Sequence, residues 1–195
     1  YNQRLTTGVS VIGIDMGAGC AGSIIANNLI HGLSQQNSSG YGAYGINISS
    51  STSNTDIAIV NNVIYDLTTR NYSATSTTYN PFGIRIVGGT GHKVWFNSVN
   101  LYGTQPEGLG TAGTLSACLI VTATGVNSLD IRNNVFSNSL VGLENSNSYA
   151  ICVIGSSATF SNINYNDYYV SGTYGVLGHI GSSYSTDNNK TTLEG

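Results

Sequence analysis

The sequence has 195 residues and a formal net charge of −3; 8% of its residues are charged and 40% are hydrophobic. The hydrophobic share permits a buried core, whereas six lysines and arginines are too few to neutralise a nucleic-acid backbone. Helical bundles are disfavoured because they need alanine, glutamate, lysine and leucine in bulk. No apolar run approaches the roughly 20 residues of a membrane-spanning helix. We expect a β protein, and its low charge with abundant Ser, Thr, Asn and Tyr favours an extracellular location.

Two short β-branched motifs recur along the chain and predict strands. Copies of the first motif are 11–14, 45–48, 83–86, 118–121 and 151–154, with a partial sixth copy at 175–178. The second motif contains asparagine and follows each copy of the first; its copies are 24–30, 59–64, 95–99, 131–136 and, more weakly, 163–169. Neither motif has the i, i+3, i+4 spacing of apolar residues that marks an amphipathic helix.

The motifs recur at a nearly constant period. The asparagines at 27, 61, 97, 133 and 166 are separated by 34, 36, 36 and 33 residues. A unit of this size cannot bury its apolar face alone, but stacked units bury it for one another. The sequence therefore predicts one all-β domain over residues 1–195, a parallel β-helix of about five to six rungs with an irregular tail at 182–195. One long loop per rung is expected at 34–42, 68–80, 103–114 and 137–148.

The asparagine of the second motif lies where the chain must bend sharply between two strands. Asparagine tolerates a positive φ better than other non-glycine residues. Its amide can also donate to, and accept from, the same amide one rung away. We therefore predict a structural ladder along the coil, formed by Asn28, Asn62, Asn97, Asn134 and Asn166.

Four stretches carry a resemblance to a known family: YGAYGINIS, YNPFGIRIVGGTGHKVWFNSVNLYG, LDIRNNVFSNSLVG and INYNDYYVSGTYGVLG. They resemble the right-handed parallel β-helix repeat of large secreted surface proteins of Bacteroidetes-type bacteria. The resemblance implies a right-handed coil and a segment of a longer, exported, modular polypeptide. The wider fold is shared with pectate lyases, polygalacturonases and phage tailspikes, which bind or cut polysaccharides. Glycans, or neighbouring domains of the same polypeptide, are therefore the expected partners.

Catalysis on this fold would need clustered side chains. A hydrolase needs paired carboxylates, and a lyase needs a base beside carboxylates that hold calcium or neutralise the uronate. In the repeat alignment neither Asp130 nor Asp167 has an acidic partner one rung away. We therefore predict no catalytic residues, no metal and no cofactor. The alternative is a polysaccharide lyase or glycoside hydrolase, with Arg85, His92 and Lys93 as the basic residues of a lyase site.

Tyrosines lie in or beside the predicted long loops. A tyrosine ring offers a flat apolar face and a polar tip, which suits stacking on a sugar. The sequence predicts ligand contacts at Tyr72, Tyr79, Tyr102 and Tyr149. The alternative is that these loops pack onto the outside of the coil and cover its exposed positions.

The ends of the predicted coil have no polar cap. A terminal rung exposes an unpaired strand edge and apolar interior, which favours end-to-end association. The function that we expect is a non-catalytic extracellular module that acts as a rigid stalk or adhesin surface and binds carbohydrate through its tyrosine-bearing loops.

Overall fold

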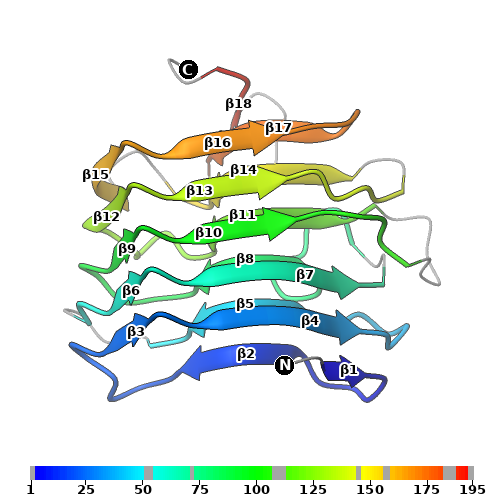
Figure 1. Cartoon of the computed structure of the whole chain (residues 1–195), viewed down its shortest axis with the longest axis horizontal. Helices are drawn as coiled ribbons and strands as arrows, with labels where there is room; N and C mark the ends of the chain where they lie inside the picture. The colour runs from blue at the N-terminus through cyan, green and yellow to red at the C-terminus, as the bar shows by residue number, and fades with distance from the viewer. Residues whose placement is uncertain are drawn as a thin grey trace.

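The computed structural model describes residues 3–50, 55–70, 73–106, 113–143, 146–155, 159–181 and 188–192. In these residues the chain winds into a parallel β-helix whose strands form three sheets along the coil axis (Figure 1). Each strand pairs in parallel with its equivalent in the next turn, as β4, β5 and β6 do with β7, β8 and β9. The predicted stacking of repeats is therefore confirmed.

The three sheets are named here A, B and C. Sheet A contains β1 (Gln3–Leu5), β4 (Leu29–Gln35), β7 (Val63–Thr69), β10 (Ser98–Leu101), β13 (Val135–Asn138) and β16 (Asp167–Val170). Sheet B contains β2 (Val11–Met16), β5 (Ala43–Ile48), β8 (Pro81–Ile86), β11 (Leu115–Val121), β14 (Asn147–Val153), β17 (Gly175–Ile180) and the antiparallel β18 (Asn189–Lys190). Sheet C contains β3 (Ile24–Ala26), β6 (Ala58–Val60), β9 (Lys93–Trp95), β12 (Leu129–Arg132) and β15 (Phe160–Asn164).

The coil makes about four turns, so the prediction of five to six rungs is wrong. Sheet C shows the reason, because its five stacked strands lead from β3 to β15 in four windings. The number of motif copies is larger than the number of turns, because a turn is complete only when the chain reaches the next copy of the same strand. The sixth copy, β17, pairs with the antiparallel β18 and leads into no further parallel strand among the described residues.

The core lies between the three sheets and is built by alternation along each strand. In β5 the side chains of Ile46 and Ile48 are fully buried and stack in register on Ile84 and Ile86 of β8. Asn47, between the two isoleucines of β5, faces the outside of the sheet, as period-2 alternation requires. Burial of apolar surface between turns is therefore continuous along the coil axis.

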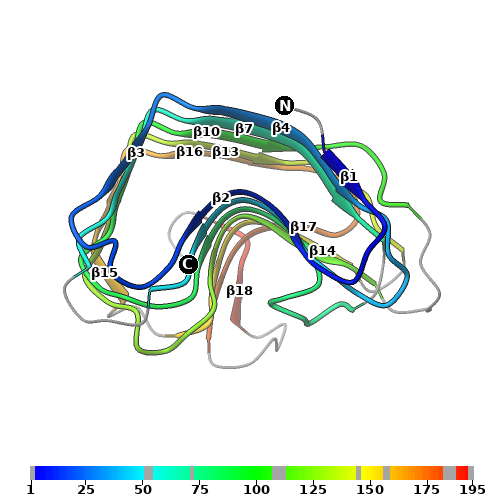
Figure 2. The same cartoon turned by 90° about the horizontal axis from the view of Figure 1, so that it is seen from below.

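Sheet B curves inward toward sheet A, as the view along the coil in Figure 2 shows. Glycines on the inner face of sheet B make this approach possible. A Cβ atom at Gly45 would lie 2.5 Å from Ile64 Cγ2 and 2.6 Å from the carbonyl oxygen of Gly83. A Cβ atom at Gly83 would lie 2.5 Å from the carbonyl oxygen of Cys118 and still closer to Val99 Cγ1. These two positions have no room for a side chain.

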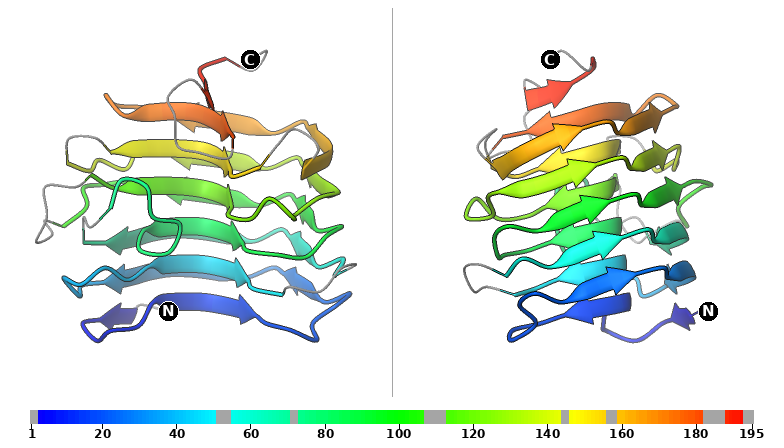
Figure 3. Two further views of the ribbon diagram at one scale, coloured as in Figure 1. Left: turned by 180° about the vertical axis from the view of Figure 1, so that it is seen from behind. Right: turned by 60° about the vertical axis from the view of Figure 1, so that its left-hand side comes forward.

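A second apolar cluster lies on the outer face of sheet B. It contains Tyr44, Phe82, Leu115, Ala117, Ile120, Tyr149 and Cys152. The loop between β7 and β8 folds over part of this face, as Figure 3 shows from behind, and the hydroxyl of Tyr44 donates to the carbonyl oxygen of Thr78 in that loop. This loop therefore packs onto the coil, which is the alternative role that the sequence left open.

The corner between sheets C and A consists of two residues with separate roles. The first residue has a positive φ in every turn: Asn27 (60°), Asn61 (54°), Phe96 (57°), Asn133 (57°) and Tyr165 (58°). The second residue is the asparagine of the ladder. The prediction that one asparagine both bends the chain and forms the ladder is therefore wrong, since two neighbouring residues divide the tasks.

Candidate functional site

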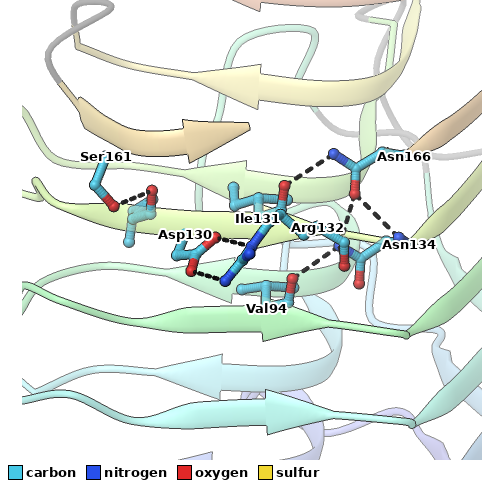
Figure 4. A network of polar contacts seen from close by, with 8 residues as sticks. Val94, Asp130, Ile131, Arg132, Asn134, Ser161 and Asn166 are labelled. Carbon is cyan, nitrogen blue, oxygen red and sulfur yellow. Dashed lines mark hydrogen bonds and ion pairs between the residues drawn. The ribbon is translucent and has the colours of Figure 1, made fainter. Parts of the chain in front are cut away.

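At each corner between sheets C and A, the residue with positive φ is called here the outer corner residue, and the asparagine after it the inner corner residue. The inner corner asparagines form one continuous hydrogen-bonded ladder. From Asn28 through Asn62, Asn97 and Asn134 to Asn166, each Nδ2 donates to the next Oδ1, at 2.9, 2.9, 3.0 and 2.8 Å. Each Oδ1 from Asn62 onward also accepts the backbone N–H of the preceding ladder asparagine. Figure 4 shows the last step of the ladder, between Asn134 and Asn166. Because the amides bind one another, the ladder is a structural element.

Arg85 lies on the outer face of sheet B, between the buried Ile84 and Ile86, where alternation along β8 places it. Its Nη1 donates to Asn47 Oδ1 (2.9 Å), and its Nε donates to the carbonyl oxygen of Thr77 (2.8 Å). The guanidinium carbon lies 4.8 Å from the centre of the Tyr44 ring. One turn away, Asn47 Nδ2 donates to Asp15 Oδ1 (2.8 Å). Arg85 therefore ties the loop between β7 and β8 to the sheet.

His92, the second basic residue of the alternative lyase site, is fully buried. Its Nε2 lies 3.0 Å from the carbonyl oxygen of Gly88 and 3.2 Å from the hydroxyl oxygen of Thr55. Burial lowers the pKa of His92, against smaller opposing effects of the Gly88 carbonyl and Asp56. The ring is buried because the turn between β8 and β9 folds back over it. A polysaccharide in solvent has no access to it.

Lys93 begins β9 in sheet C and is partly exposed. Val94 points into the core, so its neighbours Lys93 and Trp95 point outward. The basic residues of the alternative lyase site thus have three separate surroundings: the outer face of sheet B, the inside of a turn and the outer face of sheet C.

The four predicted tyrosine contacts have different environments. Tyr102 is 41% exposed. Tyr79 is half-buried and contacts the ring of Tyr41 edge-on, with 6.3 Å between ring centres. Tyr72 lies outside the described residues. Tyr149, predicted directly after the loop 137–148, belongs to β14.

Tyr149 is buried on the outer face of sheet B, with only 2% of its surface exposed. Its hydroxyl donates to Asn189 Oδ1 of β18 (3.3 Å), and its ring contacts His179 edge-on at 5.7 Å. Burial raises the pKa of Tyr149. The antiparallel β18 covers this region, so Tyr149 does not meet solvent ligands in this arrangement.

The carboxylates of Asp130 and Asp167 have no acidic residue in register in a neighbouring strand. Asp130 is in register with Lys93 and Asn162, and Asp167 is in register with Val135. Both carboxylate oxygens of Asp130 accept hydrogen bonds from Arg132, at 2.7 and 2.6 Å (Figure 4). Among the described residues, no three His, Cys, Asp or Glu side chains gather as metal ligands would.

Phe96 follows β9 and Tyr165 follows β15, the two strands that flank β12 with its ion pair, and the sequence assigned neither residue a function. Phe96 and Tyr165 are 57% and 74% exposed, at the outer corner position that asparagine fills in the other turns. The guanidinium carbon of Arg132 lies 5.2 Å from the centre of the Trp95 ring. Both aromatic residues directly precede a ladder asparagine in the sequence, and this spacing could have placed them at the outer corner.

Both ends of the coil are hollow. A cavity of about 690 Å³ opens at the C-terminal end, where its apolar lining includes Phe160, Tyr168 and Leu177. A cavity of about 210 Å³ at the other end is lined by Ile14 and Ile30, among others. These are interior positions that no further parallel turn covers in the described part of the chain.

Comparison with protein-family models, with curated proteins and with solved structures finds no match to this chain. In the described ranges, no helix is long and apolar enough to cross a bilayer. The function is therefore inferred from the fold and from the side chains on its surface.

Proposed function

We propose that the chain is a non-catalytic module of an extracellular protein, and that it acts as a rigid stalk with an adhesive surface. The observation that carries this proposal is the asparagine ladder, which joins five successive corners of the coil, with the amides of Asn62, Asn97 and Asn134 buried. A bend between turns would break these hydrogen bonds in a low-dielectric interior, where unpaired amides are costly. The ladder therefore favours a coil that resists bending, as a stalk requires.

The location and partners belong to the same proposal. The low share of charged residues and the likeness of the repeat to secreted surface proteins of Bacteroidetes-type bacteria support a cell-surface location. The cavities at the two ends expose apolar positions, and among the described strands β15 and β16 have no further partner at the C-terminal end of their sheets. Both features suit contact with neighbouring domains of the same polypeptide or with a second copy. Glycans are the ligands that we expect on the outer surface.

The alternative function is a polysaccharide lyase or glycoside hydrolase. The observation in its favour is the outward row of Asp15, Asn47 and Arg85 on the inward-curving face of sheet B. Its weakness is that Arg85 is held by Asn47, Thr77 and the ring of Tyr44, and would have to leave these contacts to take a proton from a substrate.

A product assay separates the two functions. The chain is incubated with polygalacturonate, alginate, xylan and mannan, and both unsaturated products and new reducing ends are measured. We expect no product from the chain or from an Arg85→Ala variant. Product release by the chain that disappears in Arg85→Ala would overturn the non-catalytic proposal. Circular dichroism of both proteins checks that the variant is folded.

A further inference from the structure

The outer corner position constrains its residue in every turn. Its left-handed backbone suits asparagine, which fills the position as Asn27, Asn61 and Asn133. Phe96 and Tyr165 adopt the same conformation, which is unfavourable for a bulky side chain. The two residues are 57% and 74% exposed, so little core packing offsets the strain. Two strained, exposed aromatic rings at equivalent positions indicate a role at the surface.

Asparagine at these positions would also add hydrogen bonds. Asn61 Nδ2 donates to Asn27 Oδ1 at 2.7 Å, so the outer corner has a short ladder of its own. Phe96 interrupts this outer ladder one turn further on. The aromatic residues therefore stand where another residue would serve the fold better.

The neighbouring side chains supply polar groups in fixed positions. Asp130 holds the guanidinium of Arg132 with two hydrogen bonds, and that guanidinium lies over the Trp95 ring. The exposed Asn133 occupies the turn between those of Phe96 and Tyr165. With strands about 4.8 Å apart, the two exposed rings are separated by roughly 10 Å along the coil.

We propose that this corner, formed by Trp95, Phe96, Arg132, Asn133 and Tyr165, binds a neutral glycan chain that runs along the coil axis. Ring faces stack on the apolar C–H faces of sugars, while the Asn133 amide and the guanidinium edge bind hydroxyl groups. Arg132 is paired with Asp130, which is also in register with Lys93 on the same face, and the exposed Asp167 follows Tyr165 by two residues. Two cations and two anions therefore leave this surface without the net charge that would attract a polyanion or a polycation. The inference rests on the proposed adhesive function, and it moves the ligand contact from the loops to the corner.

The test uses the double variant Phe96→Asn/Tyr165→Asn. Because asparagine suits the corner, we expect a thermal midpoint equal to or above that of the unchanged chain. Binding is measured by retardation in native gels that contain laminarin, mannan or xylan, with polygalacturonate as the acidic arm. We expect at least one neutral polysaccharide to retard the chain, and the double variant to bind it about tenfold more weakly or not at all.

The matched control is Leu29→Asn, which replaces another exposed apolar residue, 60% exposed, two strands from Ser98 along sheet A, on the side of Phe96 opposite to Tyr165. This variant should be retarded like the unchanged chain. Retardation by polygalacturonate alone, by no polysaccharide, or equally in the double variant would overturn the glycan site, as would a lower thermal midpoint in the double variant. None of these outcomes produces cleavage products, so failure of the site is distinct from failure of the non-catalytic proposal.

Discussion

Replacing Asn97 by alanine is expected to lower the free energy of unfolding by about 3–5 kcal/mol. Asn97 is 1% exposed, and its Oδ1 accepts from both the backbone N–H and the side chain of Asn62. Its Nδ2 donates to Asn134 Oδ1 and to the carbonyl oxygen of Ile59. Alanine leaves these groups buried without their partner. Urea unfolding followed by circular dichroism measures the loss.

Asn100→Ala is the control for this substitution. Asn100 lies in the same turn, on β10, and its side chain is exposed. An exposed residue away from special contacts should change the free energy of unfolding by no more than about 0.5 kcal/mol. Equal losses in the two variants would show that the ladder contributes nothing beyond an ordinary surface amide.

Replacing Gly83 by alanine is expected to cost about 2–3 kcal/mol, because the added methyl group has no room. Its Cβ would lie 2.5 Å from the carbonyl oxygen of Cys118 and closer still to Val99 Cγ1. The Cys118 carbonyl belongs to the neighbouring strand β11 of sheet B and Val99 belongs to β10 of sheet A, so β8 must shift both within sheet B and away from sheet A to admit the group. The same urea titration measures the effect.

Gly17→Ala is the matched control, because nothing lies within 4 Å of the Cβ position at Gly17. Alanine there should be neutral, or should stabilise by up to about 1 kcal/mol through the unfolded chain. If Gly83→Ala were as well tolerated as Gly17→Ala, the close approach of the two sheets would be refuted.

Much of the fold could be predicted because strands and turns follow short-range rules. Alternation along β5 and β8 is enough to place Ile46 and Ile84 inside and Asn47 and Arg85 outside. The corner was misassigned because paired asparagines, such as Asn27–Asn28, hide which residue bends and which forms the ladder. The turns with one asparagine resolve this, since Phe96 and Tyr165 take the bend and leave the ladder to the residue that follows.

Side-chain environments in the turns and tail could not be predicted from periodicity. The burial of His92 depends on how the turn between β8 and β9 folds back, and the turn differs in sequence from its equivalents. The burial of Tyr149 depends on β18, which lies in the non-repeating tail and pairs in the opposite direction. Segments outside the repeat have no equivalent in another turn to indicate their position.

Hydrogen exchange of side-chain amides tests most directly the claim that successive turns are locked in register. In NMR spectra of the unchanged chain, the Nδ2 protons of Asn62, Asn97 and Asn134 should exchange only through large-scale opening, far more slowly than those of the exposed Asn100 and Asn133. Exchange of the three ladder amides at the rate of the exposed amides would contradict the ladder, and with it the rigid surface on which the proposed function depends.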